Sequence, residues 1–145
     1  MKLKVENADV QTHVRILQDI IKRMASNSAS CKTWCVTIIA AILVLAIDKE
    51  KPSTILAGFL VAFLFFVLDA YYLSLERDFR EKYNRFVRNL HDDKAKASDV
   101  YDLAIPNDRW HRGLATICAC FSFSVIGFYG VLVLGLFVVK SVLLT

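Results

Sequence analysis

One carboxylate stands inside an apolar segment of this chain, and its chemistry demands a partner. In the stretch FLFFVLDAYYLSLERDFREKY, residues 63 to 83, Asp69 comes before any other charge, and the next charges are Glu76 and Arg77. An ionised carboxylate in hydrocarbon is costly when it is alone, and such residues usually pair with a cation or line a water-filled cavity. Asp69 is therefore the first candidate for a functional site.

Candidate partners of Asp69 lie in an upstream segment, RMASNSASCKTW, residues 23 to 34. If both segments are helices joined by the short turn near residue 50, residues that face each other have numbers that sum to about 100. Asp69 then faces residue 31, and Lys32 is the nearest cation. Small and polar residues also let helices approach closely and bond across the contact. This predicted polar layer consists of Asn27, Ser28, Ser30 and Lys32.

Three interpretations of Asp69 stay open at this point. It pairs with Lys32 and fixes the register of two helices, it faces a water-filled pore or a gating contact between subunits, or it reaches the lipid headgroups. A later apolar segment, residues 113 to 139, supplies aromatic and small residues that either face lipid or form a hydrophobic constriction. The candidates for a pore or gate are Asp69, Ser122, Phe128, Tyr129 and Gly135.

The other reactive side chains form no recognisable catalytic or metal-binding pattern. Cys31 and Cys35 share a helix face, but Cys118 and Cys120 do not, and no nearby histidine completes a tetrahedral zinc site. The three histidines are scattered and have no serine or cysteine partner that the sequence identifies. A glycine-rich phosphate loop is also missing from the sequence. We therefore predict a protein that is not an enzyme and that uses no metal and no cofactor.

The apolar residues are concentrated in three segments, which is the pattern of a membrane protein. The 145-residue chain is 56% hydrophobic, and its mean hydropathy is +0.45. The predicted transmembrane helices are residues 31–47, 53–73 and 113–140, and the last is expected to be one long helix. Lys and Arg number six in residues 1–33 and nine in residues 74–112. The positive-inside rule then places the N-terminus in the cytoplasm and the C-terminus in the periplasm.

Amphipathic segments extend the first two spans into the cytoplasm. Residues 1–30 are predicted to form a helix that continues into the first span, and residues 74–90 a helical extension of the second. Their apolar stripes fall into register across the turn with the spacing of knobs-into-holes packing. The predicted fold is an all-α, polytopic membrane protein whose first two helices form a long antiparallel hairpin that continues as a cytoplasmic coiled coil. The predicted coiled-coil interface comprises Val10, Val14, Leu17, Ile21, Phe79, Tyr83, Phe86 and Leu90.

Residues 91–112 are predicted to connect the hairpin to the third span. Residues 91–97 are small and charged and are typical of a loop. Ser98 is expected to cap a short helix that runs through Ile105 and is ended by Pro106. The apolar face of this short helix is expected to lie on the headgroups or against the coiled coil.

Two parts of the chain resemble known bacterial membrane proteins. The segments RMASNSASCKTWCVTIIAAILVLA and LDAYYLSLERDFREKY resemble a family of small bacterial multi-pass membrane proteins. More loosely, they resemble the transmembrane effectors of anti-phage defence systems that are encoded beside nucleotidyltransferases. The resemblance implies an oligomeric effector in the bacterial inner membrane that permeabilises this membrane upon infection. It also implies control by a cytoplasmic nucleotide or oligonucleotide.

These patterns, together with what the resemblance implies, lead to function hypotheses of different classes. The first is a homo-oligomeric ion channel or pore-forming effector in antiviral defense, gated by a nucleotide ligand or an operon-encoded partner protein. The second is a non-conducting membrane anchor or scaffold that recruits a soluble partner through its cytoplasmic coiled coil. A holin-like phage protein is a third class. The first predicts that Asp69→Asn or Phe128→Ala changes conductance, whereas the second predicts that the third span tolerates apolar replacement.

Overall fold

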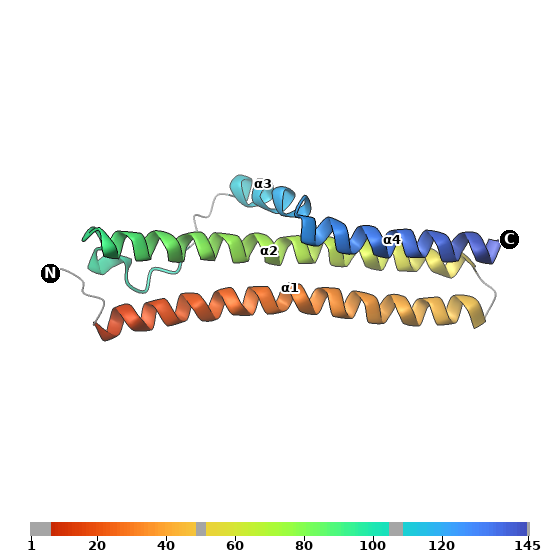
Figure 1. Cartoon of the computed structure of the whole chain (residues 1–145), viewed down its shortest axis with the longest axis horizontal. Helices are drawn as coiled ribbons and strands as arrows, with labels where there is room; N and C mark the ends of the chain where they lie inside the picture. The colour runs from red at the N-terminus through yellow and green to blue at the C-terminus, as the bar shows by residue number, and fades with distance from the viewer. Residues whose placement is uncertain (1–6, 49–51, 105–108, 145) are drawn as a thin grey trace.

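The chain folds as two very long helices followed by two shorter ones. The structure is a computed structural model, and it describes residues 7–48, 52–104 and 109–144. Its helices are α1 (Ala8–Asp48), α2 (Ile55–His91), α3 (Arg109–Cys120) and α4 (Phe123–Leu144), with short 3₁₀ turns η1 (Pro52–Thr54) and η2 (Ala97–Asp99). Helices α1 and α2 run side by side along the whole molecule (Figure 1). The predicted all-α fold and its antiparallel hairpin are confirmed.

Each hairpin helix is about twice as long as a membrane is thick. Helices α1 and α2 have 41 and 37 residues, which at ~1.5 Å per residue is about 60 and 55 Å. The hydrocarbon layer is only ~30 Å thick. Helix α1 contains neither proline nor glycine, and α2 contains only Gly58, so nothing in the sequence interrupts either helix.

Buried positions on the hairpin recur at intervals of seven residues. Examples on α2 are Ile55, Ala62 and Asp69, and on α1 Val10 and Leu17 follow the same interval, all at most 2% exposed. A repeat of seven keeps one seam of each helix facing its partner over many turns. Asp69 thus occupies a core position of the hairpin, in line with apolar residues of α2.

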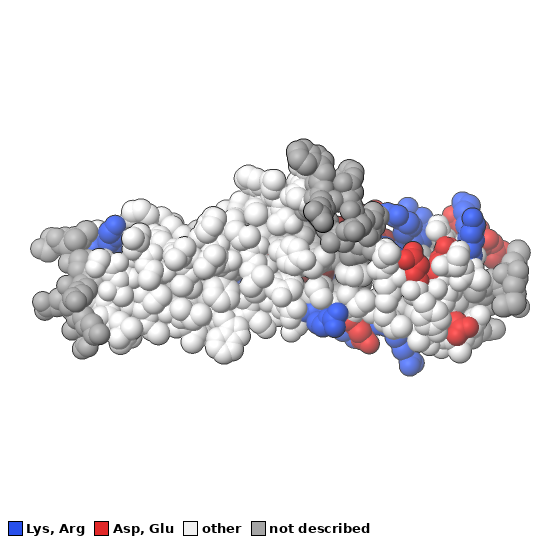
Figure 2. Space-filling view, turned by 180° about the vertical axis from the view of Figure 1, so that it is seen from behind, with Lys and Arg blue, Asp and Glu red and all other residues white. Residues whose placement is uncertain are grey.

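Charge divides the molecule into two halves. We call residues 7–30, 74–91 and 92–104 the charged half, and residues 31–48, 52–73 and α4 the apolar half. Charged side chains gather over one half of the surface, while most of the other half carries none (Figure 2). Among the described residues, three helices are long and apolar enough to span a membrane: Ala8–Ile47, Ile55–His91 and Phe123–Val142.

The third predicted span is not one unbroken helix, and that expectation was wrong. Helix α3 ends at Cys120 and α4 begins at Phe123. The Ser122 N–H donates to the Ala119 carbonyl at 3.0 Å, and the Ser122 carbonyl accepts from Val125 N–H at 3.0 Å. Serine is a favoured residue at a helix start, and here it ends one helix and begins the next. The break lets α3 leave the direction of α4 (Figure 1).

The connector also differs from its prediction. Instead of a helix from Ser98 to Ile105, the chain forms η2 and then continues without regular structure through residue 104. The Lys96 N–H donates to Asp99 Oδ2 at 2.9 Å, and the Ala104 N–H donates to Asp102 Oδ1 at 3.0 Å. Such side-chain acceptors compete with the carbonyls that a helix would use. Ile105 and Pro106 lie outside the described residues.

Helix α4 packs on the apolar half of the hairpin through one narrow face. Its buried residues are Val125, Tyr129 and Leu136. Leu136 lies against Gly58 of α2, where an added Cβ atom would be 3.2 Å from Leu136 Cδ2. The missing side chain at Gly58 therefore allows close approach of the two helices.

Candidate functional site

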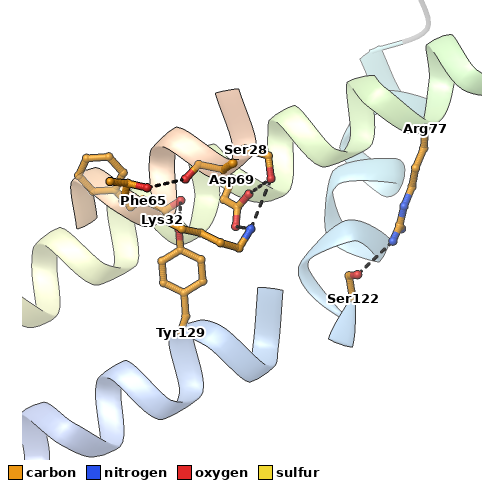
Figure 3. Close-up of polar contacts among 9 residues, drawn as sticks. Ser28, Lys32, Phe65, Asp69, Arg77, Ser122 and Tyr129 are labelled. Atoms are coloured by element: carbon orange, nitrogen blue, oxygen red, sulfur yellow. Dashed lines mark hydrogen bonds and ion pairs between the residues drawn. The ribbon is translucent and has the colours of Figure 1, made fainter. Parts of the chain in front are cut away.

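The Asp69 carboxylate is buried and makes two polar contacts with α1. Its side chain is 0% exposed, and Oδ2 lies 2.6 Å from Lys32 Nζ. Ser28 Oγ donates a hydrogen bond to Oδ1 at 2.5 Å, and Lys32 Nζ lies 3.4 Å from Ser28 Oγ. Figure 3 shows these three side chains converging between the two hairpin helices. The predicted pairing of Asp69 with Lys32 is thus found within a single chain.

Helix α4 closes the other side of this cluster with two aromatic residues. The Tyr129 hydroxyl donates to the Phe65 carbonyl at 3.1 Å, which is one helical turn before Asp69 (Figure 3). The Phe128 ring packs on Tyr129 with centroids 5.0 Å apart. Lys32 Nζ lies 6.0 Å from the centroid of the Phe128 ring. Three helices therefore meet at the ion pair, and we call Ser28, Lys32, Asp69, Phe128 and Tyr129 the ion-pair cluster.

Other predicted site residues lie outside the ion-pair cluster. Ser30 is exposed and Asn27 is half-buried on α1. Gly135 is exposed, and an added Cβ atom there would meet nothing within 4 Å. The pore candidate Gly135 therefore does not lie on the buried face of α4, which is formed by Val125, Tyr129 and Leu136.

Ser122, the remaining pore candidate, is bound by a different part of α2. Arg77 Nη2 donates to Ser122 Oγ at 3.1 Å, as Figure 3 shows. One turn before Arg77 on α2, the hydroxyls of Ser74 and Thr116 are 3.2 Å apart. These two contacts attach α3 and the α3–α4 break to the hairpin where it passes from apolar to charged. Neither contact was predicted from the sequence, because no short turn fixes the position of α3 along α2.

The predicted seam of the charged half is largely present. Val10, Leu17 and Phe86 are buried. The Gln18 amide donates to the Tyr83 hydroxyl at 3.3 Å, so the register expected from the turn holds near the far end of the hairpin. The half-buried members of the predicted interface are Val14, Ile21, Phe79, Tyr83 and Leu90. The coiled-coil geometry itself stays a prediction.

One buried residue of this seam was not identified from the sequence as a site. His13 is 0% exposed, and its ring packs edge-on against Phe86 with centroids 4.6 Å apart. Its Nδ1 atom accepts a hydrogen bond from the Tyr101 backbone N–H at 3.1 Å. The available signal was its spacing of three residues from Val10 and four from Leu17, which places it on the buried stripe.

The ion-pair cluster can hold charge inside an apolar bundle, and its chemistry is electrostatic. The carboxylate and ammonium groups neutralise each other, and the Ser28 hydroxyl satisfies a further oxygen lone pair. Within the described residues, no three His, Cys, Asp or Glu side chains are placed to bind one metal ion. Cys31 and Cys35 are buried free thiols, while Cys118 is exposed.

Comparison with known proteins supplies no relative from which a role could be transferred. No family model, no curated protein and no solved structure matches this chain.

Proposed function

We propose that this chain is an oligomeric membrane effector that forms an ion channel or pore, with the ion-pair cluster holding it closed. The observation that carries the proposal is the Asp69–Lys32 pair, in which a fully buried carboxylate meets a half-buried ammonium group inside the apolar half where three helices meet. A buried pair is weak evidence for stability, because apolar residues of similar size often stabilise a protein as well or better. Charges inside a membrane bundle are by contrast typical of ion pathways and their gates.

The expected gating motion separates α4 from the hairpin. Tyr129 and Phe128 cover the ion pair in the closed state. If α4 moves away, water reaches Asp69 and Lys32, and the energetic reason for keeping them paired weakens. Ions would then pass along a polar surface between neighbouring copies, lined by Ser28 and Asp69.

An oligomer is needed for a continuous pathway, and α4 offers a surface for it. Gly127, Gly130 and Gly135 have no heavy atom within 4 Å of an added Cβ atom. Glycines in membrane helices permit close contact with another helix. The neighbouring exposed side chains Val131 and Leu134 add apolar area.

The biological setting of this proposal is a bacterial inner membrane. The concentration of Lys and Arg in the charged half supports a cytoplasmic location for this half under the positive-inside rule. Depolarisation would then be the output of anti-phage defence. A cytoplasmic nucleotide or oligonucleotide, or a partner protein, would be the trigger that acts on the charged half.

Membrane potential in bacteria that express the chain tests the proposal. A voltage-sensitive dye compares the native chain with Asp69→Asn and Lys32→Met, with insertion confirmed by membrane fractionation. Asp19→Asn is the matched control, because Asp19 is an exposed carboxylate of the charged half. Both cluster variants are expected to depolarise the cells more than the native chain and the control do. If the cluster variants insert into the membrane but leave the potential at the control value, in cells and in liposomes, the ion-pair cluster does not hold a pore closed and the proposal is refuted.

A second candidate function is a non-conducting scaffold, favoured by a groove in the charged half. The groove has a volume of about 510 Å³. It would receive an apolar helix of a soluble partner. In that case Val14→Asp abolishes recruitment of the partner, while replacements of exposed α4 residues have no effect. The groove is lined by Val10, Gln11, Val14, Arg15, Gln18, Val87, Leu90 and His91.

A further inference from the structure

The connector after α2 folds back onto the end of the charged half. Val100 and Ala95 pack against the small apolar cluster formed by Val10 and Phe86. Through this contact, the connector packs against the hairpin before the chain continues to α3. We call residues 95–104 the clasp.

Polar contacts hold the clasp at both hairpin helices. On α1, His13 Nδ1 accepts the Tyr101 backbone N–H at 3.1 Å, and Asp9 Oδ1 accepts the Tyr101 hydroxyl at 3.3 Å. On α2, Lys82 Nζ donates to the Ala104 carbonyl at 2.6 Å. The same Lys82 Nζ is 3.2 Å from Asp102 Oδ2. Because these contacts surround Tyr101, they fix its backbone in place.

The backbone of Tyr101 is strained in this arrangement. Its φ angle is 66°, a left-handed conformation that is unfavourable for a residue with a side chain. Such a conformation persists only where surrounding contacts enforce it. Loss of one of the contacts would therefore favour release of the clasp.

The hydrogen bond from Tyr101 determines the protonation state of His13. Because Nδ1 accepts this bond, the ring is neutral and its proton is on Nε2. His13 Nε2 is buried and has no hydrogen-bond partner among the described residues. A second proton would have to sit on Nδ1, where it would face the Tyr101 N–H. Two donors would then oppose each other, and the contact would become repulsive.

We propose that His13 is a proton-sensitive lock on the clasp, closed when the imidazole is neutral and released when it takes a proton. The proposal is independent of ion conduction, because it concerns only the contact between clasp and hairpin. Release would free the segment that joins the hairpin to α3. Acidification at the charged half would thereby loosen the link between the hairpin and the last two helices.

The charges around His13 support a neutral imidazole in the closed clasp. His13 lies 18 residues before the predicted span 31–47, and its pKa is lowered, first by burial and then by the nearby Lys82 ammonium. Asp102 and Asp99 of the clasp oppose this shift, and Asp9 faces Tyr101 rather than the ring. The pKa of Asp102 is itself lowered by hydrogen bonds from the Ala104 N–H and from Lys82, so Asp102 stays ionised as His13 titrates.

The sign of the pH effect follows from proton linkage. The closed clasp binds fewer protons than the released clasp, whose exposed histidine has an ordinary pKa of about 6.5. Closure is therefore complete above this pH and weakens as the pH falls below it. The ratio of released to closed clasp rises up to about tenfold per pH unit, until His13 is protonated in the closed state as well.

Hydrogen exchange at the Tyr101 amide measures the lock directly. The full chain in lipid nanodiscs is followed by NMR between pH 7.5 and 5.5, and each rate is divided by the intrinsic rate at that pH. The protection of the Tyr101 amide is expected to fall by up to about tenfold across this range. The His91→Asn variant is the control, because His91 is exposed at the end of α2, and it should keep the native pH dependence.

Two variants at position 13 separate protonation from packing. In His13→Asn, the amide oxygen accepts the Tyr101 N–H without titrating, so protection should stay high at both pH values. In His13→Phe, packing against Phe86 is retained and the acceptor is lost, so protection should be low and independent of pH. A native chain whose protection does not change with pH, or either variant with the native pH dependence, would overturn the proposal.

Discussion

Replacing Lys32 by methionine should destabilise the bundle far more than loss of an ordinary ion pair. Asp69 is 0% exposed and would lose its cationic partner, while the Ser28 hydroxyl would still donate to it. Removing one member of a buried pair costs about 3–5 kcal/mol, because the other charge remains buried. The remaining hydrogen bond offsets part of this cost, since bonds to charged groups are worth about 1.5–3 kcal/mol. We expect a net loss of about 3 kcal/mol in the free energy of unfolding, which is roughly a hundredfold change in the equilibrium.

Reversible unfolding by dodecyl sulfate in mixed micelles, followed by far-UV circular dichroism, measures this loss. Lys94→Met is the matched control, since its pair with Asp92 is exposed, with Lys94 at 72%, and should change stability by less than about 1 kcal/mol. The double variant Lys32→Met/Asp69→Leu removes both charges and should regain most of the native stability. If Lys32→Met costs no more than Lys94→Met, or if the double variant is as unstable as the single one, the carboxylate is not an isolated buried charge and the reasoning fails.

Three further predictions concern how α3 and α4 attach to the hairpin. Tyr129→Phe removes the bond to α2 and should lower the unfolding free energy by about 1 kcal/mol in the same titration. Gly58→Leu should cost about 1–3 kcal/mol by overpacking, whereas Gly58→Ala should be tolerated because the Leu136 side chain can move. Arg77→Gln removes an exposed contact to Ser122 and should change stability by less than about 1 kcal/mol. It should also broaden the distance distribution between spin labels on α2 and α3, and an unchanged distribution would show that other contacts hold α3.

The pairing of Asp69 was predictable because few residues separate the end of α1 from the start of α2. Each helix advances by a constant rise per residue, so the register set at the turn persists along both helices. This is why Lys32 was identified as the partner, and why Gln18 and Tyr83 meet far from the turn. The heptad spacing of the apolar residues also indicates how α1 and α2 face each other.

The attachment of α4 was not predictable for two physical reasons. First, α3 follows a long connector, which leaves its position along α2 undefined. Second, α4 is apolar on every face, so periodicity does not tell which face meets the hairpin. Tyr129 faces inward because its hydroxyl can reach the Phe65 carbonyl, while Gly135 faces outward. At the break, Ser122 also accepts a hydrogen bond from Arg77, a tertiary contact that the local sequence does not indicate.

Stability alone does not explain why the bundle contains charges. If the doubly apolar variant is as stable as the native chain, the Asp69–Lys32 pair contributes little net free energy, and its presence must have another cause. Specifying the helix register is one such cause, but the short turn and the heptad core already do this. The pair makes the closed state sensitive to water. When water enters the ion-pair cluster, the attraction between the two charges weakens, and the closed state becomes less favourable. Because α4 supplies the cover through Tyr129, displacement of α4 is the event that would expose the charges, and the closed pore that we propose would use both features.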